Sequence, residues 1–147
     1  MNIAAYGISV DIPEHWEARF FRHGEGEPTL HAASFPLPHS DGEFGSKATA
    51  RMPGEGLFLS LTEYSVGDGI SIEHGLFAHP LPRSVDLRTF SSRSLLRHRQ
   101  GQRGTQRFFS AAGRAFCLYV VIAGHASARR RLGDLDRVLR TLEVVSL

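Results

Sequence analysis

The chain is poor in cysteine and in long apolar runs, and both absences limit what it can be. Its one cysteine, Cys117, excludes an internal disulfide, and the surrounding apolar run AFCLYVVIA predicts a buried thiol that packs as a small hydrophobic side chain. No stretch approaches the roughly 18 apolar residues of a membrane-spanning helix, and the N-terminal residues lack the basic and apolar regions of a secretion signal. These absences predict a cytoplasmic protein without a membrane span.

Motifs of catalytic, metal and phosphate-binding sites are also missing. The eight histidines are dispersed, with no HExxH motif and no Cys–His cluster, so neither a metal site nor a cofactor is expected. There is no GxSxG motif, and the glycines of GEGEP and VGDGI are expected to form turns rather than a phosphate-binding loop. The residues therefore identify no catalytic centre.

What the sequence does contain is typical of one globular domain. Its 147 residues, 41% hydrophobic and 22% charged, suit a single domain over residues 1–147. Charge is unevenly distributed, since residues 1–73 carry four basic and eleven acidic side chains, whereas residues 74–147 carry thirteen basic and four acidic ones. Such polarity can steer a partner, although the two halves can also face each other within the fold.

An alternating pattern near the start of the chain predicts a half-buried strand. Tyr6, Ile8, Val10 and Ile12 share one face of it, and Pro13 ends it because proline cannot donate a ladder hydrogen bond. Further strands are expected in the residues that follow, with irregular segments between them. The expected strands are 17–23, 29–35 and 57–64, and the expected irregular segments are a long surface loop at 36–56 and a second stretch at 66–82.

The C-terminal half has the pattern of an antiparallel meander. Alternation around 85–88 and a segment at 94–99 lead into an expected strand at 105–111, and a turn at Ala112 and Gly113 separates it from the last long strand. That strand, 114–123, is apolar on both faces. It is therefore expected inside the sheet, covered on two sides.

A helix is predicted after Gly124. Its leucines repeat at spacings of three and four, which places them on one stripe that should pack against the sheet. Ser127 is a candidate N-cap, and a later start near Gly133 is the alternative. The stripe consists of Leu132, Leu135, Leu139 and Leu142. These elements together predict an α+β domain with a mostly antiparallel sheet of six to eight strands and this C-terminal helix packed on one face.

The order of elements resembles the PsbP-like fold. The resemblance is carried by Ile8, Val10, Pro13 and Trp16, by the hairpin that leads into FCLYVVIAG, and by the terminal VLRTLEVV. This α/β sandwich is the fold of the extrinsic photosystem II subunit and of small Ran-binding nuclear import factors, and several uncharacterised bacterial families also use it. Residues 36–82 have no clear counterpart of a further covering helix in that pattern. The resemblance implies an assembly factor or binding module rather than a catalyst, and it supplies no site residues.

We therefore expect a non-enzymatic binding module that acts through contacts with a protein partner or with a second copy of itself as a homodimer. Two alternatives remain open. One is a nucleic-acid or anion binder through the basic stretch 93–107, where strand alternation would place Arg97 and Arg99 on one exposed face. The other is a small enzyme with its site under the loop 36–56. The candidate partner- or anion-binding residues are Arg93, Arg97, Arg99, Arg103 and Arg107.

Overall fold

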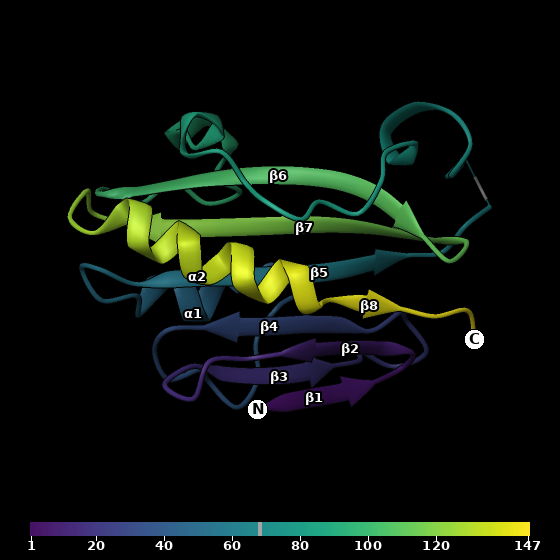
Figure 1. Cartoon of the computed structure of the whole chain (residues 1–147), viewed down its shortest axis with the longest axis horizontal. Helices are drawn as coiled ribbons and strands as arrows, with labels where there is room; N and C mark the ends of the chain where they lie inside the picture. Colours follow the sequence, from purple (N-terminus) through teal and green to yellow (C-terminus); the bar gives the residue numbers. More distant parts are fainter. Residues whose placement is uncertain (68) are drawn as a thin grey trace.

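The computed structural model of the chain describes residues 1–67 and 69–147. Within these residues, eight strands form two antiparallel sheets of five and three strands, accompanied by one long helix, one short helix and three 3-10 turns (Figure 1). The α+β class and the mostly antiparallel strands predicted from the sequence are confirmed.

The large sheet has the strand order β3-β4-β5-β7-β6, and every neighbouring pair is antiparallel. Its strand β7 pairs with both β5 and β6, and all ten of its residues are buried. The prediction that the doubly apolar segment is an interior strand is therefore confirmed. The bounds are β3 (Glu17–Phe21), β4 (Thr29–Ala33), β5 (Leu57–Tyr64), β6 (Gln102–Ala111) and β7 (Arg114–Ala123).

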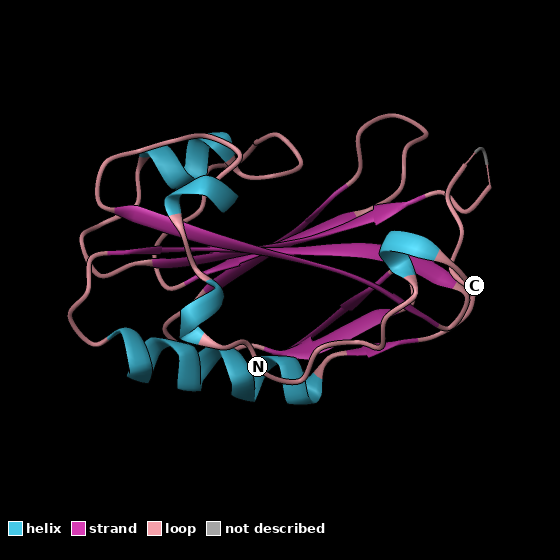
Figure 2. Ribbon diagram, turned by 90° about the horizontal axis from the view of Figure 1, so that it is seen from above, coloured by secondary structure: helices cyan, strands magenta, loops and turns pink. Residues whose placement is uncertain are grey.

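The small sheet, in the order β1-β2-β8, lies with the long helix α2 along one face of the large sheet (Figure 2). Its strand β2 pairs with β1 through a tight hairpin and with β8 from the far end of the chain. The bounds are β1 (Asn2–Ala5), β2 (Ile8–Asp11), α2 (Ala128–Thr141) and β8 (Glu143–Val144).

Between this layer and the large sheet lies the main hydrophobic core. The four leucines of the predicted stripe are all buried in it, as is Trp16, which is 4% exposed. The helix begins at Ala128 directly after Ser127, so the alternative start near Gly133 was wrong. Ser127 adopts a left-handed conformation and its side chain makes no capping hydrogen bond.

The opposite face of the large sheet is covered by residues 34–56, which include the short helix α1 (Ser46–Ala50). This loop is anchored by buried polar groups. The carboxylate of Asp41 accepts hydrogen bonds from the backbone N–H groups of Gly42, Lys47 and Ala48, which fixes the start of α1. His31 is fully buried and its Nε2 lies 2.9 Å from the Glu43 carbonyl oxygen.

Two local predictions were wrong. Tyr6 does not continue the strand of Ile8; it has φ of 55° and forms, with Gly7, the turn of the β1–β2 hairpin, so β1 was missed. Residues 85–99 contain no named strand. They form the 3-10 turns η2 (Leu87–Thr89) and η3 (Ser92–Ser94), which the side chains of Asp86 and Ser91 cap.

Candidate functional site

The outer edge of β6 is the most informative surface of the molecule because β6 ends the large sheet. In an antiparallel strand, successive residues direct their backbone N–H and C=O groups to opposite sides. Gly104 exchanges two hydrogen bonds of 3.0 Å with Ser91, and the Ser110 N–H donates to the His79 carbonyl oxygen at 3.0 Å. Neither partner belongs to β7. The even-numbered residues of β6 therefore direct their backbone groups outward.

One continuous segment, residues 79–91, makes both of these contacts, and we refer to it as the strap. The strap crosses the β6 edge at Ser110, runs over the face of the sheet that carries α2, and crosses back at Gly104 (Figure 1). The 3-10 turn η1 (Gly75–Phe77) precedes it. Because Pro80 and Pro82 have no N–H group, the strap cannot continue a ladder along β6 beyond His79.

Contacts with α2 hold the strap in place. Val85 and Phe90 are buried in the main core, and the Val85 N–H donates to the Asp136 carboxylate at 3.1 Å. The Arg83 guanidinium donates to the carbonyl oxygens of Leu139 and Leu142, each at 2.7 Å, at the end of the helix. The Leu142 carbonyl lies beyond the last residue of the helix and has no partner within it, whereas the Leu139 carbonyl also accepts from the Leu142 N–H group. The strap is thus a fixed part of the fold.

Between the two crossings the edge of β6 is open. The backbone N–H and C=O groups of Gln106 and Phe108 face outward, and no residue in the described part of the chain pairs with them. A cavity of about 360 Å³ lies at this position. We refer to Thr105–Phe109 as the β6 window. The residues that line the cavity are Leu76, His79, Pro80, Leu81, Pro82, Gln106, Arg107 and Phe108.

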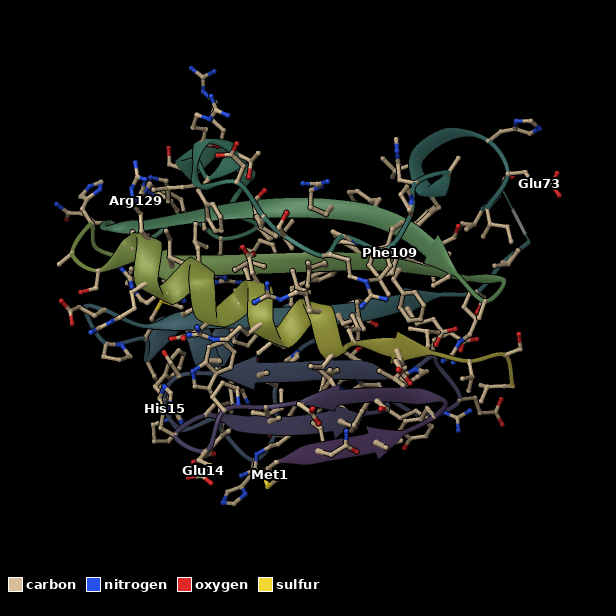
Figure 3. The ribbon with its side chains drawn as sticks, in the orientation of Figure 1. Met1, Glu14, His15, Glu73, Phe109 and Arg129 are labelled. Atoms are coloured by element: carbon tan, nitrogen blue, oxygen red, sulfur yellow. The ribbon has the colours of Figure 1, made fainter. Side chains whose placement is uncertain are left out.

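The two sides of the window differ in chemistry. Phe109, labelled in Figure 3, is buried in the main core on the face of the large sheet that carries α2, so the odd-numbered side chains of β6 lie on the α2 side. Arg103 and Arg107 belong to this set, and neither forms an ion pair with any described residue. Phe108 lies on the opposite side, where its ring packs edge-on against Phe77 at 5.5 Å. The window therefore has a cationic side and an apolar side.

The five arginines predicted as a site do not form one surface. Arg93 and Arg97 lie exposed in η3 and the segment after it, and Arg99 is half-buried with Nη2 3.5 Å from the Ser46 carbonyl oxygen of α1. These three lie on the α1 side, whereas Arg103 and Arg107 lie on the α2 side. The expectation that strand alternation pairs Arg97 with Arg99 was wrong, because neither residue is in a strand.

The space under the loop 36–56 is filled by side chains. Leu37 and Ala48 of the loop pack with Phe58, Tyr119 and Val121 of the large sheet in a second hydrophobic cluster. A cavity of about 390 Å³ lies at the loop, but its lining comes only from 37–40, Lys47 and Arg51, so no side chain of the sheet reaches it. Over the residues that the structure describes, no group of three or more His, Cys, Asp or Glu side chains is placed to hold a metal ion.

Sequence reasoning singled out Arg107 but missed Gln106 and Phe108. These two residues matter because of their backbone groups, which every residue has, so their residue types give no signal. Their place in the fold also depends on the two crossings of the strap, which is not adjacent to β6 in the sequence. The one local signal is the pattern HPLP at 79–82, because two alternating prolines prevent strand pairing.

Among the described helices, none has both the length and the apolar character needed to cross a membrane. Comparison with known proteins finds no family model, no curated protein and no solved structure that matches this chain.

Proposed function

We propose that this protein is a binding module that captures an extended segment of a partner protein by strand addition to the β6 window. One observation carries the proposal: the backbone groups of Gln106 and Phe108 have no partner among the described residues, and they lie at a sheet edge beside a cavity, between the two strap crossings. Main-chain hydrogen bonds to an open edge are a general mode of peptide recognition. The resemblance to the PsbP-like fold supports a binding role independently.

The hydrogen bonds available predict weak binding of an isolated segment. The two residues offer two donors and two acceptors, and four net hydrogen bonds contribute roughly 2–6 kcal/mol. Lost translational and rotational freedom costs about 4 kcal/mol or more, so these main-chain bonds alone leave at most about 2 kcal/mol, which corresponds to a Kd of roughly 30 mM or weaker. A partner held by further contacts would gain from the high effective concentration of its segment.

A peptide selection with a matched pair of variants tests the proposal. Random heptapeptides displayed on phage are selected against the protein, and the enriched peptides are synthesised and titrated while backbone amide NMR signals are followed. Gln106→Pro removes the outward N–H, whereas Gln106→Ala keeps it, and both variants lose the side-chain bond from Gln106 to the Ser94 carbonyl oxygen. Proline is tolerated at sheet edges, so both variants should fold.

The selected peptides should shift the amide signals of 105–109, bind the alanine variant and fail to bind the proline variant. No shift of the 105–109 signals with any synthesised peptide, or peptides that shift signals elsewhere and bind both variants equally, would overturn strand addition at this edge.

A further inference from the structure

The geometry of the β6 window also restricts the chemistry of its partner. Resting on the function proposed above, we infer that the window accepts a short antiparallel segment with the pattern apolar–acidic–polar, read from the N-terminus of that segment. The inference follows from the length of the open edge, from the side chains on its two sides and from the exclusion of pairing between two β6 edges.

The length of the open edge sets the length of the segment. Gly104 and Ser110, where the strap crosses, are six residues apart, which corresponds to about 20 Å of strand. Each crossing chain occupies about 5 Å of that edge, the spacing of neighbouring strands. About three to four residues can therefore pair with β6 before the partner must turn away. A loop, a hairpin tip or a chain terminus meets this limit, whereas a long strand does not.

The side chains of the partner follow from antiparallel register, which is the arrangement of every strand pair in this structure. Two partner residues would exchange hydrogen bonds with Phe108 and Gln106, and the residue between them would lie opposite Arg107. That central pair is of the non-hydrogen-bonded type, in which the two Cα atoms are about 4.5 Å apart and the side chains project to the same face.

Charge complementarity defines the central residue. It would lie beside Arg107, with Arg103 on the same face, and neither arginine is neutralised by a described carboxylate. Two acidic side chains of the strap and α2 already have partners, since Asp86 pairs with Arg88 and Asp136 accepts from the Val85 N–H group of the strap. An aspartate or glutamate is therefore the complement of this position.

The residue opposite Phe108 would project to the other side, next to the ring of Phe108 and towards η1. Phe77 of η1 packs on that ring, and Leu76, which is 57% exposed, lines the same cavity. An apolar side chain fits this position. The residue opposite Gln106 would meet a polar amide and is expected to be polar.

The β6 edge of a second copy of this chain does not fit the window. Antiparallel pairing of two β6 edges about Arg107 would place Gly104 of each copy opposite Ser110 of the other, where both positions are occupied by strap crossings. It would also set two Arg107 side chains next to each other on one face, which is a destabilising like-charge pair. The occupant is therefore not the β6 edge of a second copy but an extended segment of a partner with the complementary charge.

The test uses one defined peptide and three modified forms. The probe is acetyl-Ser-Gly-Val-Glu-Thr-Gly-Ser-amide, titrated up to roughly 30 mM, the Kd that the main-chain bonds alone can give, with amide NMR readout. In one form lysine replaces the glutamate, in the second the valine and threonine nitrogens are methylated, and the third is a scrambled sequence. The protein variants are Arg107→Glu and, as matched control, Arg22→Glu, which changes an exposed arginine next to β3, at the opposite edge of the large sheet.

We expect the probe to shift the signals of Gln106 and Phe108, and the lysine peptide to bind about three to ten times more weakly. Arg107→Glu should reverse this preference, and Arg22→Glu should preserve it. Equal binding of the glutamate and lysine peptides would overturn the acidic preference but leave strand addition standing. Binding that survives methylation of both nitrogens, or no shift at 105–109 with any peptide, would overturn the proposed function as well.

Discussion

The buried ion pair between Glu63 of β5 and Arg114 of β7 is expected to be among the most sensitive polar contacts in the fold. The two side chains are 6% and 8% exposed, and two charge-assisted hydrogen bonds of 2.7 and 2.9 Å join them. Arg114 also donates to the Val145 carbonyl oxygen at 2.9 Å, so it connects the large sheet to the segment after β8. Replacing either partner alone leaves a buried charge without compensation.

The magnitude follows from this asymmetry. Removing one member of a buried pair costs about 3–5 kcal/mol, a large part of a typical unfolding free energy of about 5–15 kcal/mol. Glu63→Leu and Arg114→Met should each lower stability by this amount. If the two single effects were additive, the double variant would lose roughly 6–10 kcal/mol of unfolding free energy. Because both charges are absent from it, the double variant should lose far less than this sum.

Guanidinium unfolding followed by fluorescence measures these differences, because Trp16 is the single tryptophan and is buried. Arg88→Ala serves as control, since this side chain forms an ion pair but is 91% exposed, and its removal should leave the unfolding midpoint unchanged. Single variants that each cost less than about 1 kcal/mol, or a double variant as unstable as the sum of the singles, would refute the reasoning.

Three further predictions concern buried groups. Burial lowers the pKa of His31 from its ordinary value of 6.5, so its contribution to stability is present above about pH 6.5 and is lost as the pH falls through the folded-state pKa. In denaturation measured between about pH 7 and pH 5, the unfolding free energy of His31→Gln should therefore depend less steeply on pH than that of the parent protein, and equal slopes would contradict this. Burial raises the pKa of Cys117 to about 12, so a thiol reagent at about pH 8 should label it only after unfolding, and rapid labelling of the native protein would contradict its burial. A Cβ atom at Gly45 would overlap the ring of Phe58, whereas one at Gly24 would meet open space, and both glycines have positive φ. In thermal unfolding, Gly45→Ala should therefore lower the unfolding free energy by about 1–3 kcal/mol more than Gly24→Ala does.

Apolar periodicity was sufficient to predict the elements whose burial is one-sided or complete. Ile8, Val10 and Ile12 alternate because one face of β2 packs on the core, and the leucines of α2 repeat because one stripe of the helix does. The interior strand β7 was recognisable because both of its faces are apolar. In these segments, whether a residue is apolar or polar indicates directly whether its side chain is buried.

The strap and the β1–β2 hairpin could not be read in this way. Alternation at Val85 and Leu87 suggested a strand, but Asp86 and Ser91 form local capping bonds that stabilise 3-10 turns instead. Tyr6 matched the apolar pattern of β2, although the adjacent Gly7 marked a turn with positive φ. The β6 window depends on His79 and Ser91 meeting residues far along the chain, and no periodicity records such contacts.

The pairing of the first and last strands affects the order of folding. β2 aligns with β8 through the pair Ile8 and Val144, so this part of the small sheet closes only after nearly all of the chain between them has been synthesised. The hairpins β3–β4 and β6–β7 join strands that are close in sequence and can assemble earlier. Contacts between such distant segments slow folding, because loop-closure entropy is lost before the contact forms. Until β8 docks, β2 lacks that neighbour, and the nascent chain exposes an extra pairing edge to other polypeptides.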